Sequence, residues 1–289
     1  MSSIESLYFF IKYYLNYDTM LSKKGYKMSK NLSYEEKLAR VRDFRPIDDV
    51  FFELLASNKE VCEEILRTIL EDVELTVEDV IVQSSERNVY GRSVRLDALC
   101  TLGNGSKCNI EVQRADNDDH LRRARFNAAS ITVKESAPGD RFEDVSNVCI
   151  VYISEFDFLA KGKTIYHIDK VIRETNDIID DGLTEIFVNT AVDDGTDIAD
   201  LMSCFIKKEV NNPKFPRFSS EVRKLKETEG GLSTMCELME KYNQEAVNKN
   251  QTTIIENMIT EGLQYEQIAR IVNVSVADIK DIASRMKEN

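Results

Sequence analysis

The stretch SVRLDALCTLGNGSKCNIEVQ, residues 93–113, decides the fold, because it has the pattern of a β-hairpin with a tight loop. Gly103, Asn104 and Gly105 are residue types that accept the positive φ angles of such loops. On both sides of the loop, apolar side chains alternate with polar ones. The expected apolar face consists of Val94, Leu96, Ala98, Cys100, Leu102, Cys108, Ile110 and Val112, with Leu99 as an apolar exception on the polar face.

The register of this hairpin follows from matching like faces, since a slip of one residue would place each apolar row against a polar one. A three-residue loop gives the match. Asp97 then lies opposite Glu111, and Arg95 lies opposite Gln113. Opposed carboxylates repel each other, and a hard divalent cation with oxygen ligands, such as Mg²⁺, would relieve that repulsion. The alternative is a pair of solvated carboxylates on the wet face of an antiparallel sheet.

Three segments resemble a known family of nucleases. Asp97, followed by Glu111-Val112-Gln113 on the next expected strand, resembles the D…ExK signature of the PD-(D/E)XK nuclease superfamily. RPIDDVFFELL (45–55), residues 95–113 and RRARFNAASI (122–131) resemble, in this order, motifs of the recombination-promoting nuclease and putative transposase family, called Rpn. The resemblance covers about residues 41–200. It implies an α/β fold with a restriction-endonuclease-like α-β-β-β-α-β core and a mixed sheet.

The resemblance also implies roles for single residues. Asp97 and Glu111, with the carbonyl of Val112, would hold Mg²⁺ or Mn²⁺. Gln113 would occupy the position where the superfamily usually has a catalytic lysine, and we expect Arg95 to supply the missing positive charge as a further catalytic residue. The chain departs from the family pattern at two positions, Phe52 in place of a usual Lys and Asn127 in place of a common Tyr.

The distribution of charge bears on the partner. A net charge of −13 argues at first against nucleic acid. Between Ser84 and Lys134, however, nine basic residues stand against six acidic ones. We therefore expect a DNA-binding surface, while a solvated helix face is the alternative reading of such a charge run. The expected DNA-binding residues are Arg114, Arg122, Arg123 and Arg125.

Cysteine and hydropathy patterns indicate a compartment. The six cysteines form no CxxC motif and the two histidines are scattered, which argues against a zinc site. Cys100 faces Cys108 in the expected register, and we favour free thiols over a disulfide. No run of about 18 apolar residues is present, so we expect no membrane span. A cytoplasmic protein fits these features.

The rest of the chain divides into further segments. Residues 1–40 read as an N-terminal extension, with Met20 or Met28 as conjectured starts, and 41–195 as the nuclease-like domain. Within that domain we expect helices over 50–56 (capped by Asp48 or Asp49), 59–70 (capped by Asn58) and 120–134, and strands over 77–83, 147–154, 163–174 and 183–191.

A C-terminal helical region follows. Residues 196–250 read as a helical appendage with helices over 198–210, 219–226 and 232–247, and 251–289 as a helix-turn-helix-like tail. In that tail we expect helices over 252–260, 265–272 and 276–286, the last capped by Ser275. Because the last helix carries Asp278 and Asp281, a protein contact is favoured over direct reading of bases.

We therefore predict a metal-dependent DNA endonuclease. The main rival is a non-catalytic DNA-binding or assembly protein that keeps the nuclease fold, and a third reading is a fold that acts on RNA. The sequence leaves a homodimer open.

Overall fold

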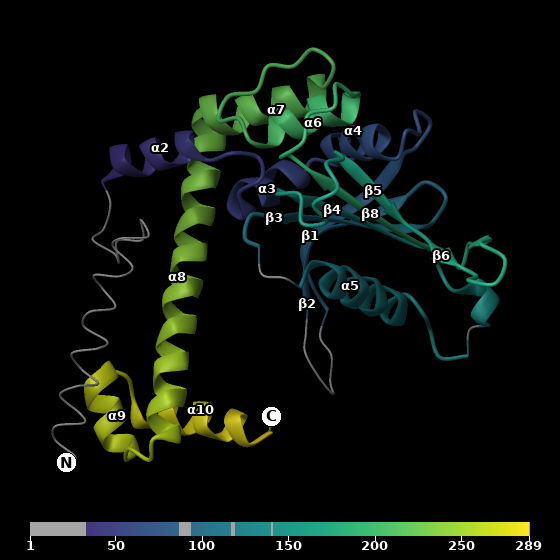
Figure 1. The fold of residues 1–289 in the computed structure, drawn as a ribbon. Coiled ribbons are helices and arrows are strands. Elements are labelled where there is room, and N and C mark those ends of the chain that lie inside the picture. Colours follow the sequence, from purple (N-terminus) through teal and green to yellow (C-terminus); the bar gives the residue numbers. More distant parts are fainter. Residues whose placement is uncertain (1–32, 87–93, 117–118, 140, 289) are drawn as a thin grey trace. The chain divides into compact units, whose positions relative to one another are not determined.

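A computed structural model of the chain describes residues 33–86, 94–116, 119–139 and 141–288 (Figure 1). The expected extension up to residue 32, with Met20 and Met28, lies outside the described residues. Two compact units divide at Asp43 and Phe44. The first contains helix α2 (Tyr34–Asp43). Ser33 and Glu36 begin this helix with reciprocal bonds between side chain and backbone, which satisfy two free N–H groups.

The second unit is built around a six-stranded mixed sheet with strand order β1-β2-β3-β4-β8-β5. Neighbouring strands run antiparallel from β1 to β3, parallel from β3 through β4 to β8, and antiparallel between β8 and β5. The mixed sheet of the sequence analysis is thus confirmed. The strands are β1 (Val77–Glu86), β2 (Val94–Leu102), β3 (Lys107–Gln113), β4 (Val148–Ser154), β5 (Ile165–Ile168) and β8 (Leu183–Asn189). A separate ribbon pairs β6 (Lys170–Val171) with β7 (Ile178–Ile179).

The hairpin loop has the expected length. Cys100 lies opposite Cys108, and the Leu102 N–H donates to the Ser106 carbonyl at 2.9 Å, which leaves three residues in the loop. Gly105 has a φ of 84°, a conformation that favours glycine. At Gly103 an added Cβ would lie 2.1 Å from Thr76 Oγ1, so this position tolerates no side chain without a shift of Thr76.

The alternation of β2 is interrupted at Asp97. The pairing with β3 ends at Ala98 opposite Ile110, and Gln83 on β1, which would face Asp97, has a φ of 52°. As a result, Leu96 packs in the same cluster as Leu99. The prediction that Leu96 shares the face of Cys100 was therefore wrong, because it assumed that side chains alternate regularly along the whole of β2.

Helices cover both faces of the sheet (Figure 1). Helix α5 (His120–Lys134), confirmed at its expected bounds, packs on one face through a buried cluster that includes Leu96, Ala128 and Tyr152. Helices α3 (Asp49–Ala56) and α4 (Lys59–Ile69) lie on the other face. Asn58 caps α4 as predicted, since its side chain accepts the Glu60 N–H. The order of these elements confirms the α-β-β-β-α-β core.

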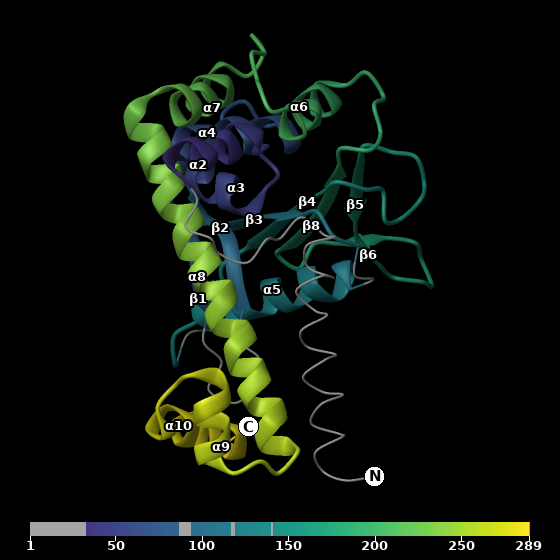
Figure 2. The ribbon, with the colours of Figure 1, turned by 90° about the vertical axis from the view of Figure 1, so that its left-hand side faces the viewer.

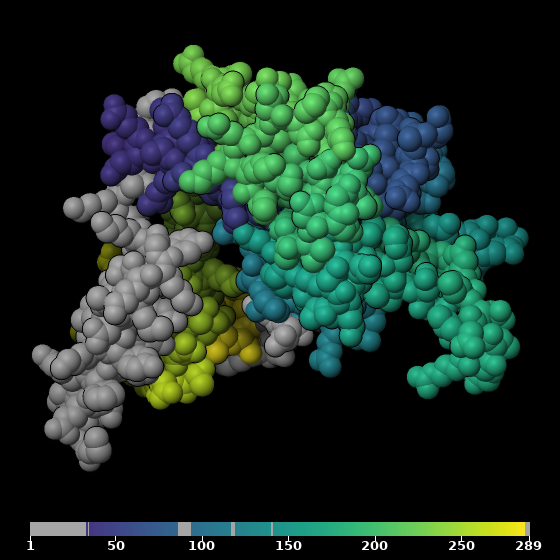
Figure 3. Space-filling view, turned by 45° about the horizontal axis from the view of Figure 1, so that its top comes forward, coloured from purple at the N-terminus to yellow at the C-terminus, as the bar shows by residue number. Residues whose placement is uncertain are grey.

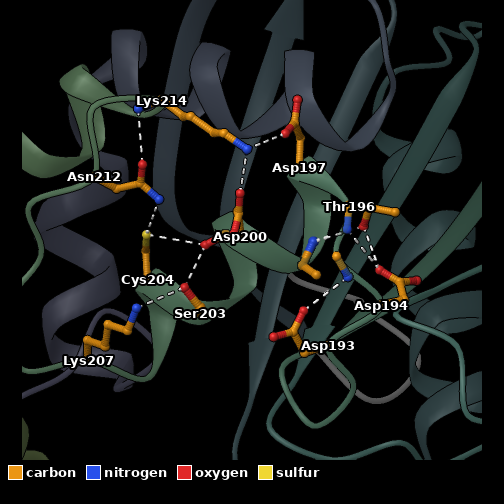
Figure 4. Close-up of polar contacts among 12 residues, drawn as sticks. Asp193, Asp194, Thr196, Asp197, Asp200, Ser203, Cys204, Lys207, Asn212 and Lys214 are labelled. Atoms are coloured by element: carbon orange, nitrogen blue, oxygen red, sulfur yellow. Dashed lines mark hydrogen bonds and ion pairs between the residues drawn. The ribbon is translucent and has the colours of Figure 1, made fainter.

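Three helices continue the second unit. They are α6 (Asp197–Phe205), α7 (Pro216–Glu227) and α8 (Glu229–Thr260). In the space-filling view α6 and α7, in green, adjoin α4, in blue (Figure 3). Thr196 caps α6, and Lys214 ties the segment before α7 to Asp197 and Asp200 at 2.7 and 2.5 Å (Figure 4). Pro216 begins α7, where its missing N–H costs nothing.

Helix α8 runs without interruption across the segments expected at 232–247 and 252–260, so the prediction of a break between them was wrong. It passes beside α3 and β2 and ends at the tail (Figure 2). The tail helices are α9 (Tyr265–Val272) and α10 (Val276–Glu288), with a turn at Asn273 in the left-handed conformation. Ser275 caps α10 as expected. An apolar cluster of its own, with Ile255, Ile268 and Ile279, holds this tail together.

All six cysteines are buried free thiols, which confirms the preference against a disulfide. No helix in the described part of the chain combines the length and the apolar character that crossing a bilayer requires.

Candidate active site

Two acidic side chains meet where the alternation of β2 is interrupted. Asp97 Oδ2 accepts the backbone N–H of Val112 at 3.0 Å, which holds the Asp97 carboxylate beside Glu111. Glu111 lies on β3 and is only 4 % exposed. This contact is available because the pairing between β2 and β3 ends at Ala98 and Ile110, so that the Val112 N–H bonds to a side chain instead of to a strand backbone.

Burial controls the proton affinity of this pair. It raises the pKa of Asp97 well above the ordinary value, and the charge of Glu111 adds to the effect, while the Val112 N–H opposes it. Burial also raises the pKa of Glu111 to about 7, against the opposing effects of Asn109, Arg123 and Asn127. A positive charge between the two carboxylates would favour their ionised forms and so lower both pKa values.

Two buried amides bind Glu111. Asn109 on β3 and Asn127 on α5 both have no exposed surface, and each Nδ2 donates to Glu111 Oε2 at 3.3 Å. Their Oδ1 atoms are buried and accept no hydrogen bond among the described residues. Sequence reasoning noted Asn127 only as a departure from the family pattern and did not identify Asn109.

Arg123 is one of the four expected DNA-binding residues, and its charge acts on both Asp97 and Glu111. It lowers the pKa of Glu111 and of Asp97, and its guanidinium lies 3.5 Å from Asp119 Oδ2. Arg122 and Arg125 are exposed on α5 and form no ion pair within the described ranges. They are therefore available to an external anion.

Arg114 belongs to an ion network. Its guanidinium lies 2.6 Å from Asp48 Oδ1 and 3.3 Å from Glu155 Oε2, and Arg45 lies 2.6 Å from Glu155 Oε1. The Asp48 side chain accepts the Arg45 N–H at 2.6 Å and does not cap α3, although Asp48 stands at the N-cap position. Capping by its carboxylate is thus a wrong prediction, because the arginines and the Arg45 backbone take its oxygens.

Arg95 and Gln113 were expected to face each other, but each contacts other groups. Arg95 lies 3.3 Å from Glu245 and 4.0 Å from Glu53, with its guanidinium 5.4 Å from the centre of the Tyr242 ring. The Gln113 amide donates to the Ala115 carbonyl at 2.7 Å. Their expected pairing presupposed that β2 and β3 stay paired beyond Ala98 and Ile110, whereas Arg95 lies against Glu53 of α3 and Glu245 of α8.

Further polar groups adjoin the pair and were missed from the sequence. Asp49 on α3 adds a third negative charge near Asp97, and burial raises its own pKa. Tyr152 lies beside Glu111 in the parallel register of β3 and β4, and its hydroxyl is 3.0 Å from His120 Nδ1. His120 Nε2 is 3.0 Å from Asp116. The sequence does contain a signal for His120, because this residue is polar and falls on the apolar face of an expected helix.

The donor chemistry fits a divalent cation. Two carboxylates with raised pKa values and a backbone carbonyl, that of Val112, are oxygen ligands of the kind that Mg²⁺ takes together with water and phosphate oxygens. No group of three or more His, Cys, Asp or Glu side chains in the described part of the chain is placed to hold a metal. The site therefore offers a two-carboxylate arrangement.

Comparison with known families matches the part of the chain that contains these residues. A family model described as PD-(D/E)XK nuclease family transposase matches residues 46–193, from just before α3 to the loop after β8. No match was found among curated proteins or among solved structures.

Proposed function

The chain belongs to the PD-(D/E)XK nuclease family transposases, and on this premise we propose that it is a metal-dependent endonuclease that hydrolyses phosphodiester bonds in DNA. The observation that carries the proposal is the pair of Asp97, whose carboxylate accepts the Val112 N–H, and the buried Glu111, whose carboxylate accepts from two buried amides. Carboxylates on an ordinary exposed surface are not held by such a set of hydrogen bonds.

Asp97, Glu111 and the Val112 carbonyl hold Mg²⁺ or Mn²⁺ in this proposal. The bound ion would lower the pKa of a water molecule and neutralise charge on the scissile phosphate. Gln113 would orient the attacking water through its amide, which requires that its bond to the Ala115 carbonyl be exchanged. Assistance by Arg95 stays a proposal that requires its guanidinium to leave Glu53 and Glu245.

The arginines divide by their contacts. Arg122 and Arg125, exposed and without an ion pair among described residues, would contact backbone phosphates, which position DNA without reading its sequence. Arg123 would act closer to the carboxylates. Arg114 would contribute only if a phosphate displaces Asp48 or Glu155.

The division of the chain is also part of the proposal. The family match ends at residue 193, and residues 251–289 would form an accessory module for self-association or affinity. The buried free thiols accord with a reducing compartment such as the cytoplasm.

A supercoiled-plasmid assay tests the activity. Nicking should require Mg²⁺ or Mn²⁺ and be abolished by Asp97→Ala or Glu111→Ala, with folding checked by a thermal melt. Full activity of either variant, or activity in excess EDTA, would contradict the metal site. An RNA substrate in parallel reactions distinguishes action on RNA.

A second candidate is a non-catalytic DNA-binding or assembly protein with the nuclease fold. The observation that favours it is Gln113, an uncharged residue at the usual lysine position whose amide is already engaged. In that case divalent metal would cause no cleavage, although DNA would still bind.

A further inference from the structure

A buried polar contact to Glu111 links helix α5 to strand β3. Asn127 comes from α5 and Asn109 from β3, yet both amides reach the same oxygen, Oε2, at 3.3 Å. Neither asparagine has exposed surface. A single amide could meet a carboxylate as a by-product of packing, but two from different elements that converge on one oxygen define its position.

The orientation of the two amides follows from the same contact. When Glu111 is ionised, as it would be with a cation bound, rotating either amide by 180° would place its carbonyl oxygen against the Glu111 oxygen, and two acceptors would meet without a proton. The donors therefore point to Glu111 and leave the two Oδ1 atoms buried without a donor. Such unpaired acceptors carry a desolvation cost, so stability alone does not favour asparagine here.

We propose that Asn109 and Asn127 are positioning residues that clamp Oε2 of Glu111 and so present its other oxygen, Oε1, to the divalent cation. This inference rests on the proposed function for its metal and extends it to two residues that touch neither cation nor DNA. Outer groups that hold a metal-binding carboxylate commonly change metal affinity about 10–100-fold when they are removed.

The position of Asn127 gives the clamp its specificity. It lies on the buried face of α5, between Ala124 and Ile131, where an apolar residue would satisfy the packing. Asn127 also stands one turn after Arg123, whose charge acts on the same carboxylate. The two residues place a charge and a hydrogen bond on Glu111 from one helix.

Mn²⁺ binding, measured by electron paramagnetic resonance without DNA, tests the clamp independently of catalysis. Asn127→Leu and Asn109→Leu should each weaken Mn²⁺ binding about tenfold, in the range that outer groups contribute. Ile131→Val, on the same buried face, is the matched control, because it disturbs packing without contacting Glu111. Its dissociation constant should stay within about twofold of wild type, as expected for a change outside the outer shell.

A second readout separates positioning from folding. In plasmid nicking, Asn127→Leu should require more Mn²⁺ for half-maximal rate and approach the wild-type rate at saturating Mn²⁺. Where Asn127→Leu does not fold, Asn127→Ser replaces it, since its hydroxyl is too short to reach Oε2, and Asn109→Leu tests the clamp from β3.

The outcomes distinguish this inference from the proposed function. Folded asparagine variants that bind Mn²⁺ as wild type does, or a control that weakens binding equally, would overturn the clamp while leaving nuclease activity intact. Weakened binding together with no cleavage by any form, wild type included, would support the clamp and contradict the nuclease. A wild type without saturable Mn²⁺ binding would overturn the clamp and the metal site together.

Discussion

Replacement of Glu111 by glutamine should stabilise the metal-free protein, and increasingly so as the pH rises. Glu111 is buried, which raises its pKa from an ordinary 4.5 to about 7. Between these two values the folded state holds a proton that the unfolded state has lost. The free energy of unfolding of the wild type therefore falls as the pH rises through this window. Glutamine keeps the shape and an acceptor for the amides but carries no charge.

The magnitude follows from the two pKa values. The rise from 4.5 to about 7 corresponds to about 3 kcal/mol at roughly 1.4 kcal/mol for each tenfold change in proton affinity. For a chain of this size, that difference amounts to roughly 5–10 °C in melting temperature. Melting curves of wild type and Glu111→Gln in EDTA should therefore converge as the pH falls below 4.5 and separate by about this amount at pH 8, as the linkage relation requires.

A control of opposite sign is available in Glu155. Burial alone would raise the pKa of Glu155, but hydrogen bonds and charge from Arg45 and Arg114 lower it below the ordinary value. The ionised carboxylate then contributes stability above its unfolded pKa, which is lost as the pH falls through the folded pKa. Glu155→Gln should be less stable than wild type at neutral pH. If Glu111→Gln is also less stable than wild type at pH 8, or if the melting temperatures of the two proteins differ by the same amount at every pH, the description of the site as a strained carboxylate pair is refuted.

Three further predictions concern other parts of the molecule. Gln113→Lys should keep or raise the nicking rate, and Arg95→Ala should lower the rate of wild type more than that of Gln113→Lys in a double-mutant cycle; strictly additive effects would show that Arg95 acts only through its contacts with Glu53 and Glu245. Deletion of residues 251–289 should leave the core folded in a thermal melt and change self-association or DNA affinity, because the tail has its own apolar cluster; an unfolded product would contradict this. Gly103→Ala should lower the melting temperature, and Thr76→Ala should restore it, since only Thr76 Oγ1 obstructs the new methyl group.

Local patterns were sufficient for much of the fold. The Gly103–Gly105 loop and the alternation next to it correctly gave the pairing of Cys100 with Cys108. Capping residues correctly gave the start of α4 and the turn between the tail helices. These features depend on residues within a few positions of one another, so a single sequence contains the information.

The errors arose where distant parts of the chain act on one residue. The face of Leu96 and the partners of Arg95 depend on the interrupted alternation at Asp97 in β2, which involves Gln83 on the preceding strand and Val112 on the next. The polar segment around Asn250 resembles a break between two helices, yet without glycine or proline it continues as α8. Hydrophobic periodicity alone does not distinguish a solvent-exposed stretch inside a helix from the end of that helix.

The positioning groups of the site show which sequence signal is informative. Asn127 falls on the apolar face of α5, in the row with Ala124, Ala128 and Ile131, and Asn109 lies two residues before Glu111 on a buried strand. A buried amide in such a row is costly unless a partner uses its hydrogen bonds. Here the partner is one carboxylate oxygen, Oε2 of Glu111, which accepts from Asn109 on the same strand and from Asn127 on helix α5. A polar residue that interrupts an otherwise apolar periodicity is thus a pointer to the site, and its target becomes identifiable only when the register and the helix packing are known.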